Sequence, residues 1–302
     1  MDVVIAGASG FIGTALAESL QAGGHRVARL VRPDSPAVIG ETIAWDPQAA
    51  RIDAKGLEGV DAVVNLGGVG IGDRKWTDER KEEILASRLA ATSLLSNALA
   101  RLSQPPAVFV TASAVGYYGN RGDEELTEDS GPGDDFLARV CVAWEDAAKP
   151  AAAAGLRVAW VRTGIVLHPA GGVLRRLLPP FRLGAGGRIG SGKQYMSWIT
   201  LEDVVAAIGA IIDDHTLGGP VNLTAPNPVT NAEFTATLGK VLRRPTAVPT
   251  PLTPLKLRYG RELVEHLLLF GQRVRPAKLE ASRFAFGHTE LEPALRALLG
   301  RE

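Results

Sequence analysis

The chain has 302 residues, enough for one elaborated domain or two closely joined lobes with a large core. Its 33 lysines and arginines balance 33 aspartates and glutamates without blocks of like charge, which argues against nucleic acid or an anionic membrane as partner. No apolar run approaches the ~20 residues of a membrane span. The only cysteine, Cys141, excludes an intramolecular disulfide and fits a reducing compartment. Because residue 2 already leads into a predicted strand, we expect no signal peptide and a soluble, cytoplasmic protein.

The stretch from Val3 to Gly13 predicts a strand, a glycine turn and the start of a helix. Apolar residues run into three glycines spaced G-x-x-G-x-x-G, and residues 14–20 continue as a helix. Such a turn directs free backbone N–H groups and the positive helix end at a pyrophosphate. A purely structural turn is the alternative, but the flanking strand and helix favour a dinucleotide site. Its candidate residues are Gly7, Ser9, Gly10, Phe11, Ile12 and Gly13.

Residues 26–31 predict a second strand, and Arg32 follows it directly. NAD-specific sites carry an acidic residue at about this point to hold the ribose 2′-hydroxyl, whereas an arginine suits a 2′-phosphate. Arg32 as an ordinary surface residue is the alternative. The arginine, in place of Asp or Glu, favours NADP(H) over NAD(H) as the cofactor.

Residues 43–46 predict a short third strand, and the apolar run 60–66 predicts a buried parallel strand. Leu66, Gly67 and Gly68 stand at its carboxyl end, where ligands sit in open α/β sheets. A long helix is expected from about residue 77 to residue 101, with Ser87 and Arg88 on or near its core-facing stripe. Polar groups on such a stripe need partners, and both a local helix pairing and contact with the cofactor would supply them.

The fifth predicted strand, 107–111, leads to Ser113, Tyr117 and Tyr118, and a helix is expected over 136–148. The sixth strand, 158–167, is interrupted at Thr163 and Gly164. Alternating strands and helices with short linkers predict an α/β fold with a doubly wound parallel sheet. Thr163, Gly164 and Val166 are expected to lie beside the nicotinamide.

The pattern changes from residue 171 onward, where arginine, proline and glycine become dense. We therefore predict an NADP-binding Rossmann domain over residues 1–170 and a smaller C-terminal substrate lobe over residues 171–302. A helix at 201–212 and a strand at 221–223 indicate that residues 199–224 return to the sheet.

Several stretches together resemble the extended or atypical short-chain dehydrogenase/reductase superfamily. Within it, the chain resembles the epimerase-family group, also labelled cell-division-inhibitor-like or NAD(P)-dependent epimerase/dehydratase proteins. The matching stretches span nearly the whole length: GASGFIG (7–13), NLGG (65–68), SAVGYYG (113–119), DFLARVCVAWE (135–145), RTGIVL (162–167), GSGKQYMSWI (190–199), APNPVTNAEF (225–234) and QRVRPAKLEASRF (272–284).

The resemblance implies a nicotinamide cofactor and a serine that polarises a carbonyl, a position that Ser113 matches. The superfamily's proton relay, a tyrosine and a lysine spaced Y-x-x-x-K, does not match, because Leu137 and Cys141 stand there. Tyr117 or Tyr118 is a candidate replacement, with a packing role as the alternative. Cys141 is interpreted as a small core residue rather than a nucleophile.

Nucleotide-sugar members of the superfamily place a diphosphate-binding arginine where this chain has Met196, so a nucleotide-sugar substrate is not expected. The five histidines show no metal-ligand spacing, and no metal is predicted. The leading hypothesis is an NADP(H)-dependent oxidoreductase or epimerase/dehydratase acting on a small hydroxy or carbonyl compound. A non-catalytic NADP(H)-binding, redox-sensing regulator is the alternative. The expected partner is a small-molecule substrate, and the oligomeric state stays open.

Overall fold

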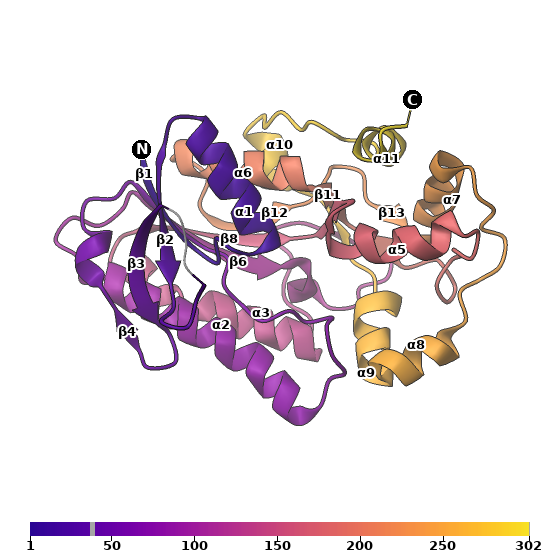
Figure 1. Cartoon of the computed structure of the whole chain (residues 1–302), viewed down its shortest axis with the longest axis horizontal. Helices are drawn as coiled ribbons and strands as arrows, with labels where there is room; N and C mark the ends of the chain where they lie inside the picture. Colours follow the sequence, from indigo (N-terminus) through magenta and orange to yellow (C-terminus); the bar gives the residue numbers. More distant parts are fainter. Residues whose placement is uncertain (37–39, 302) are drawn as a thin grey trace.

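The computed structural model describes residues 1–36 and 40–301, and a large central sheet dominates it (Figure 1). Eight strands follow the order β12-β8-β6-β5-β1-β2-β3-β4, and every neighbouring pair except β3–β4 is parallel. Their bounds are β1 Asp2–Ala6, β2 Arg26–Val31, β3 Glu41–Asp46, β4 Arg51–Ile52, β5 Ala62–Asn65, β6 Val108–Ala114, β8 Arg157–Thr163 and β12 Gly219–Leu223. The predicted doubly wound α/β fold is confirmed.

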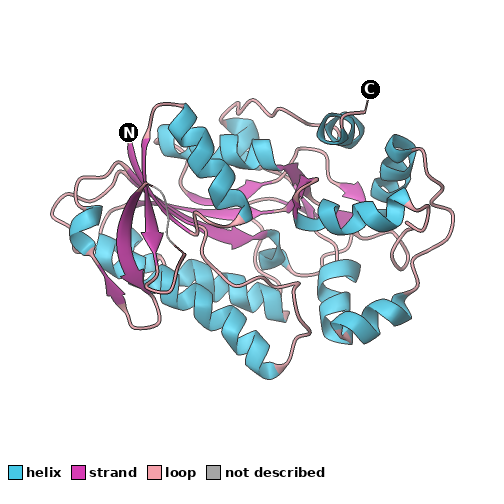
Figure 2. Ribbon diagram, viewed as in Figure 1, coloured by secondary structure: helices cyan, strands magenta, loops and turns pink. Residues whose placement is uncertain are grey.

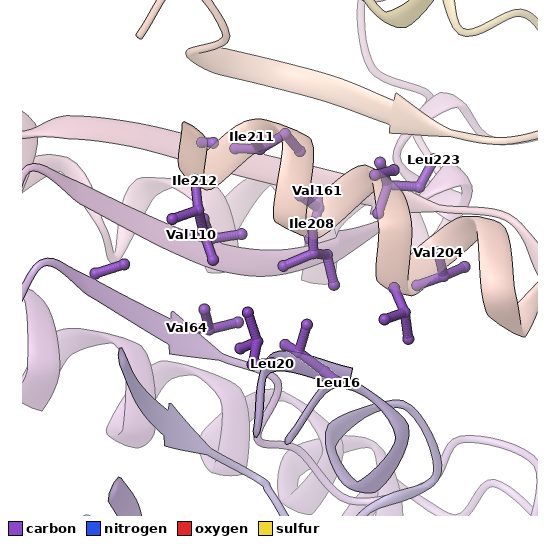
Figure 3. Packing of buried hydrophobic residues seen from close by; sticks show 14 of the residues in the cluster. Leu16, Leu20, Val64, Val110, Val161, Val204, Ile208, Ile211, Ile212 and Leu223 are labelled. Carbon is purple, nitrogen blue, oxygen red and sulfur yellow. The ribbon is translucent and has the colours of Figure 1, made fainter. Parts of the chain in front are cut away.

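Helices cover both faces of the sheet, which explains why its strands read as continuous apolar runs (Figure 2). On one face lie α1 (Phe11–Ala22) and α6 (Leu201–Asp213), and on the other α2 (Asp78–Leu99), α3 (Phe136–Asp146) and α4 (Lys149–Ala153). Figure 3 shows Leu16 and Leu20 of α1 and Ile208 of α6 directed at Val64 and Val110 of the strands. This apolar layer fixes α1, and with it the glycine turn at its start.

The strand order reverses at β1, because β2 lies on one side of it and β5 on the other. The connections that follow β1 and β5 therefore leave in opposite directions, and in open α/β sheets such a point is where a ligand-binding crevice forms at the carboxyl edge. Both glycine-rich stretches identified in the sequence lie at this point. The candidate site is thus organised around the ends of β1, β5 and β6.

Most of the remaining elements build a lobe at one end of the sheet, with its own core around Leu174, Phe181, Trp198, Phe234 and Leu295 (Figure 1). Helix α10 (Ala277–Ala281) instead lies beside β12, and its Leu279 joins the core of the α1 face. The other elements are β7 Glu125–Leu126, β9 Ile165–His168, α5 Gly172–Arg182, β10 Tyr195–Met196, β11 Trp198–Thr200, β13 Val229–Thr230, α7 Asn231–Leu242, α8 Leu252–Tyr259, α9 Arg261–Val264, the π-helix η3 Glu265–Leu269, β14 Arg273–Val274 and α11 Leu291–Leu299. The short 3-10 helices are η1 Ala54–Leu57 and η2 Val115–Tyr118. No helix in the described part of the chain is both long and apolar enough to traverse a bilayer.

The predicted sixth strand, 158–167, is in fact two strands. β8 belongs to the central sheet, whereas β9 pairs with β11 in a separate two-stranded sheet. Gly164 makes the break, because its N–H donates to Leu223 and a Cβ there would overlap the carbonyl oxygen of Ser197. The chain passes from the sheet into the lobe at this glycine.

Candidate functional site at the carboxyl edge of the sheet

The turn between β1 and α1 is packed too tightly for side chains at two of its glycines. Gly7 has φ +79°, and a Cβ there would lie 2.9 Å from the carbonyl carbon of Leu66. A Cβ on Gly13 would overlap the carbonyl oxygen of Gly7. Because Gly7 lies so close to Leu66, the glycine turn and the end of β5 pack against each other through backbone atoms.

The N-terminus of α1 is left free to receive an anion. Its N-cap is Gly10, which contributes no side-chain hydrogen bond, and its first turn holds no acidic residue. The first helical hydrogen bond is made by the N–H of Thr14 to Gly10, so the N–H groups of residues 11–13 precede the regular ladder. Together with the helix dipole they suit a pyrophosphate, and the turn therefore fits a dinucleotide.

The other predicted residues of the turn have distinct surroundings. Ser9 is exposed, and Ile12 packs against the core of the α1 face. The Phe11 ring lies so close to Gly171 that a Cβ there would overlap it, and its centroid is 5.9 Å from that of His168. Phe11 thus connects the glycine turn to the loop that enters the C-terminal lobe.

Arg32 is exposed immediately beyond β2, with its backbone N–H donating to Ser35 Oγ over 3.2 Å. Next to the crevice, the N–H of Leu66 donates to Ala6, and the N–H of Gly67 donates to Asn65 Oδ1 over 3.2 Å. The carboxyl ends of β2, β1 and β5 lie side by side, because these strands are neighbours in the sheet, and contacts of their residues with a cofactor stay a prediction.

Ser87 and Arg88 make the local helix pairing that the sequence gives as one alternative, and both also contact the loop after Gly68. Ser87 Oγ donates to Ile84 within α2 and accepts from the N–H of Val69. Arg88 Nη1 donates to the carbonyls of Ile84 and Val69 over 3.0 and 3.1 Å. Both side chains hold the loop after Gly68 against α2, and a cofactor contact by either stays a prediction.

Ser113, at the end of β6, is tied to a buried ion pair. Its Oγ donates to Glu145 Oε1 over 2.7 Å. Arg162 on β8 donates to both oxygens of the same carboxylate, over 2.8 and 2.9 Å. Burial acts to lower the pKa of Arg162, but the hydrogen bonds and charge of Glu145 outweigh it and leave the pKa raised. The positive charge of Arg162 thus balances the negative charge of the Glu145 carboxylate, and this carboxylate fixes the direction of the Ser113 hydroxyl.

The two tyrosines of η2 differ in access. Tyr118 is fully buried, donates to Asn222 Oδ1 over 2.7 Å and accepts from Arg162 Nη1. Burial raises the pKa of its phenol to about 12. Tyr117 is half-buried, with its ring centroid 3.4 Å from the guanidinium carbon of Arg162. A catalytic role for either tyrosine stays a prediction, and only Tyr117 has access to solvent.

Leu137 and Cys141 lie on the side of α3 that faces η2, where a Cβ on Gly116 would meet both. Cys141 is buried, and burial, followed by the charge of Glu145, raises the pKa of its thiol to about 12. A thiol that stays protonated at neutral pH is a packing residue, as interpreted from the sequence.

Thr163, Gly164 and Val166 border the site from β8 and β9. Thr163 Oγ1 donates back to Val161 over 3.3 Å, and Val166 packs beside the core of the α1 face. Their contact with a nicotinamide stays a prediction.

Sequence reasoning missed the ion pair of Glu145 and Arg162, and also Glu128, whose Oε1 accepts from the N–H of Asn222 while its Oε2 is buried without a partner. One signal was available: Arg162 follows the apolar run 158–161, and a charge in a buried strand requires a counter-charge. Within residues 1–36 and 40–301, no group of histidine, cysteine, aspartate or glutamate side chains could hold a metal ion.

The sequence from residue 3 to residue 223 matches the model of the NAD dependent epimerase/dehydratase family. The chain belongs to this family. A second model, a domain of unknown function named DUF1731, matches residues 250–298 of the C-terminal lobe. The membership confirms the family that the sequence stretches resemble.

Relatives of the family match almost the whole chain. The epimerase family protein Mb2239 of Mycobacterium bovis is 47% identical over 97% of this chain and 96% of its own. The crystal structure of human epimerase family protein SDR39U1 (isoform 2) with NADPH has a TM-score of 0.89 and 36% identity, covering 99% of both chains. A nucleoside-diphosphate sugar epimerase from Corynebacterium glutamicum has a TM-score of 0.80 and 38% identity, covering 99% of this chain and 58% of that one.

Proposed function

We propose that this epimerase family member is an NADP(H)-dependent oxidoreductase or epimerase/dehydratase that acts on a small hydroxy or carbonyl compound. The observation that carries the proposal is the placement of the open α1 N-terminus and Ser113 on one edge of the sheet. β1 and β6 are separated by β5 alone, so the two lie about 10 Å apart across the strands. That separation suits a pyrophosphate at one end and a reacting nicotinamide ring at the other.

The preference for NADP(H) is supported by two features. Arg32 is exposed directly after β2, beside the turn that would hold the pyrophosphate, and carries a charge that suits a 2′-phosphate. The human relative of known structure was solved with NADPH. In this chain, Arg32→Asp should reverse the preference, so that the ratio of the NADPH to the NADH dissociation constant rises at least tenfold. An unchanged ratio would refute the role of Arg32.

The bound cofactor supplies the hydride chemistry, and the protein supplies position and protons. Ser113 commits its own proton to Glu145, so its oxygen offers lone pairs to the ligand. Such an oxygen accepts a hydrogen bond from a substrate hydroxyl and thereby orients an alcohol carbon toward the nicotinamide. Tyr117 is the proposed proton-exchanging group, because Tyr118 is buried and its hydroxyl is already engaged by Asn222 and Arg162.

A small substrate is favoured over a nucleotide sugar by the side chain at residue 196. Met196 is buried, and its sulfur accepts a hydrogen bond from Asn231 instead of contacting an open surface. A thioether offers no positive charge to a diphosphate. The protein should therefore bind UDP-glucose and similar nucleotide sugars no more tightly than it binds free glucose.

The decisive experiment needs no prior choice of substrate. NADPH carrying deuterium at nicotinamide C4, in separate preparations labelled on either face, is incubated with the protein and a metabolite extract. Hydride transfer would be established if the wild-type protein removes deuterium from one face of the nicotinamide only and the Ser113→Ala variant removes none. The metabolite that acquires the deuterium would identify the substrate.

The same experiment distinguishes the second candidate, a non-catalytic NADP(H)-binding regulator. The observation that favours a regulator is that Leu137 and Cys141 occupy the side of α3 where the superfamily carries its proton relay. Tight NADPH binding with retention of both labels would contradict the enzymatic proposal and support this candidate.

A further inference from the structure

Arg88 is a buried cation that forms no ion pair within the described residues. It lies on α2 with 9% of its surface exposed. In the part of the chain that the structure describes, no carboxylate pairs with it; of the two side chains whose charges act on it, Cys141 is a thiol and Arg80 is also positive. Burial is the main cause of a lowered pKa for its guanidinium. An uncompensated buried charge is unfavourable unless a ligand satisfies it.

The position of the guanidinium is fixed by packing on three sides. Nη1 donates to two carbonyls, those of Val69 and Ile84. The Trp144 ring centroid lies 4.8 Å from its central carbon, and a Cβ on Gly68 would lie 3.3 Å from that carbon. Within the described residues, Nε and Nη2 make no hydrogen bond, and neither nitrogen is completely buried. Both are therefore accessible to a ligand. The guanidinium is therefore held rigidly with two donors unused.

Arg88 also adjoins the catalytic edge. Its charge acts on the thiol of Cys141, and that thiol in turn interacts with the Ser113 hydroxyl. Cys141 stands at the position that, by the family resemblance, would carry a lysine in α3. A cation that approaches the same place from α2 thus borders both the crevice loop at Gly68 and the end of β6.

We propose that Arg88 donates hydrogen bonds to the hydroxyl groups of the nicotinamide-side ribose of the bound dinucleotide. This inference rests on the proposed function and deepens it: α2 supplies the positive charge that α3 lacks. Arg88 is a cofactor-binding residue here, and its effect on the reaction comes from fixing the nicotinamide relative to Ser113.

The test measures binding rather than turnover, using calorimetry with two probes. NADPH contains the nicotinamide-side ribose, whereas adenosine 2′,5′-bisphosphate lacks it and reports on the adenosine side alone. Arg88→Met should weaken NADPH binding roughly 10- to 100-fold, as expected for lost hydrogen bonds from a charged donor, and leave bisphosphate binding unchanged. Arg88→Lys should recover part of the affinity. The double variant Arg88→Met, Cys141→Lys should recover more than Arg88→Met alone, because it returns a cation from α3.

The matched control is Arg101→Met, which removes an exposed arginine just beyond the end of α2 and should change neither affinity. Unaltered NADPH affinity in Arg88→Met would overturn the inference and leave the proposed function intact. Equal weakening of both probes would show a purely structural role and overturn it as well. If the wild-type protein bound neither probe, the proposed function itself would fail.

Discussion

Replacing Arg162 by methionine removes one partner of an ion pair in the interior of the protein. Arg162 and Glu145 have side chains that are only 3% and 11% exposed. After the substitution, the Glu145 carboxylate keeps its hydrogen bond from Ser113 but loses both guanidinium donors. We expect Arg162→Met to lower the free energy of unfolding by about 3–5 kcal/mol, the usual cost of stranding one buried charge.

The complementary variant, Glu145→Leu, strands the guanidinium instead and should cost a similar amount. In the double variant both charges are gone and an apolar pair fills the space, a replacement that is often close to neutral. Three hydrogen bonds remain unmade, one from Ser113 and those to Tyr118 and to the carbonyl of Glu128, at about 1 kcal/mol each. The double variant should therefore be more stable than either single variant, with a coupling energy of at least about 2 kcal/mol.

Thermal and urea unfolding of the four proteins measure this coupling. The single variants should melt roughly 5–8 °C below the wild type. The control is Arg26→Met, which breaks surface ion pairs of a side chain that is 67% exposed and should cost less than about 1 kcal/mol. Additive losses, with the double variant equal to the sum of the singles within about 0.5 kcal/mol, would refute the argument that the pair acts as a unit.

Three further predictions concern single positions. Gly13→Ala should abolish NADPH binding in a calorimetric titration, because its Cβ would overlap the turn backbone. In contrast, a Cβ at Gly209 has nothing within 4 Å, so Gly209→Ala should raise the free energy of unfolding by about 0.5–1 kcal/mol. Iodoacetamide at pH 8 should leave Cys141 unmodified in the native protein and alkylate it in urea, since its pKa is raised to about 12; rapid native alkylation would contradict this. The folded pKa of Tyr118, raised by burial from 10.0 to about 12, means that the native state keeps a proton which the unfolded chain releases. Relative to Tyr118→Phe, wild-type stability should therefore be constant below about pH 10 and fall as pH rises toward 12, as read from urea midpoints; a parallel course of the two proteins would exclude the shift.

The fold could be predicted from the sequence where local pattern decides structure. Parallel strands covered on both faces appear as apolar runs, and the start of α1 is marked by glycines, of which Gly7 has a positive φ and Gly13 has no space for a Cβ. The sequence indicates the interruption at Gly164, but not that the chain leaves the central sheet there and that β9 pairs with β11. The separation of β8 from β9 depends on contacts with Ser197 and Leu223, which lie 33 and 59 residues further along the chain (164 to 197 and 164 to 223).

The candidate site divides in the same way. The glycine turn is a local motif, so its residues could be identified together. The pair of Glu145 and Arg162 joins a helix to a strand, and the sequence shows only that a charge in strand β8 needs a partner, without showing which carboxylate provides it. A lysine motif has a fixed spacing within one helix, and its absence from α3 is visible in the sequence. The structure adds that α2 brings Arg88 against α3, with its guanidinium over the Trp144 ring and next to Gly68. In the proposal made above, the positive charge at the cofactor comes from α2, and a motif with a fixed spacing within α3 gives no indication of it.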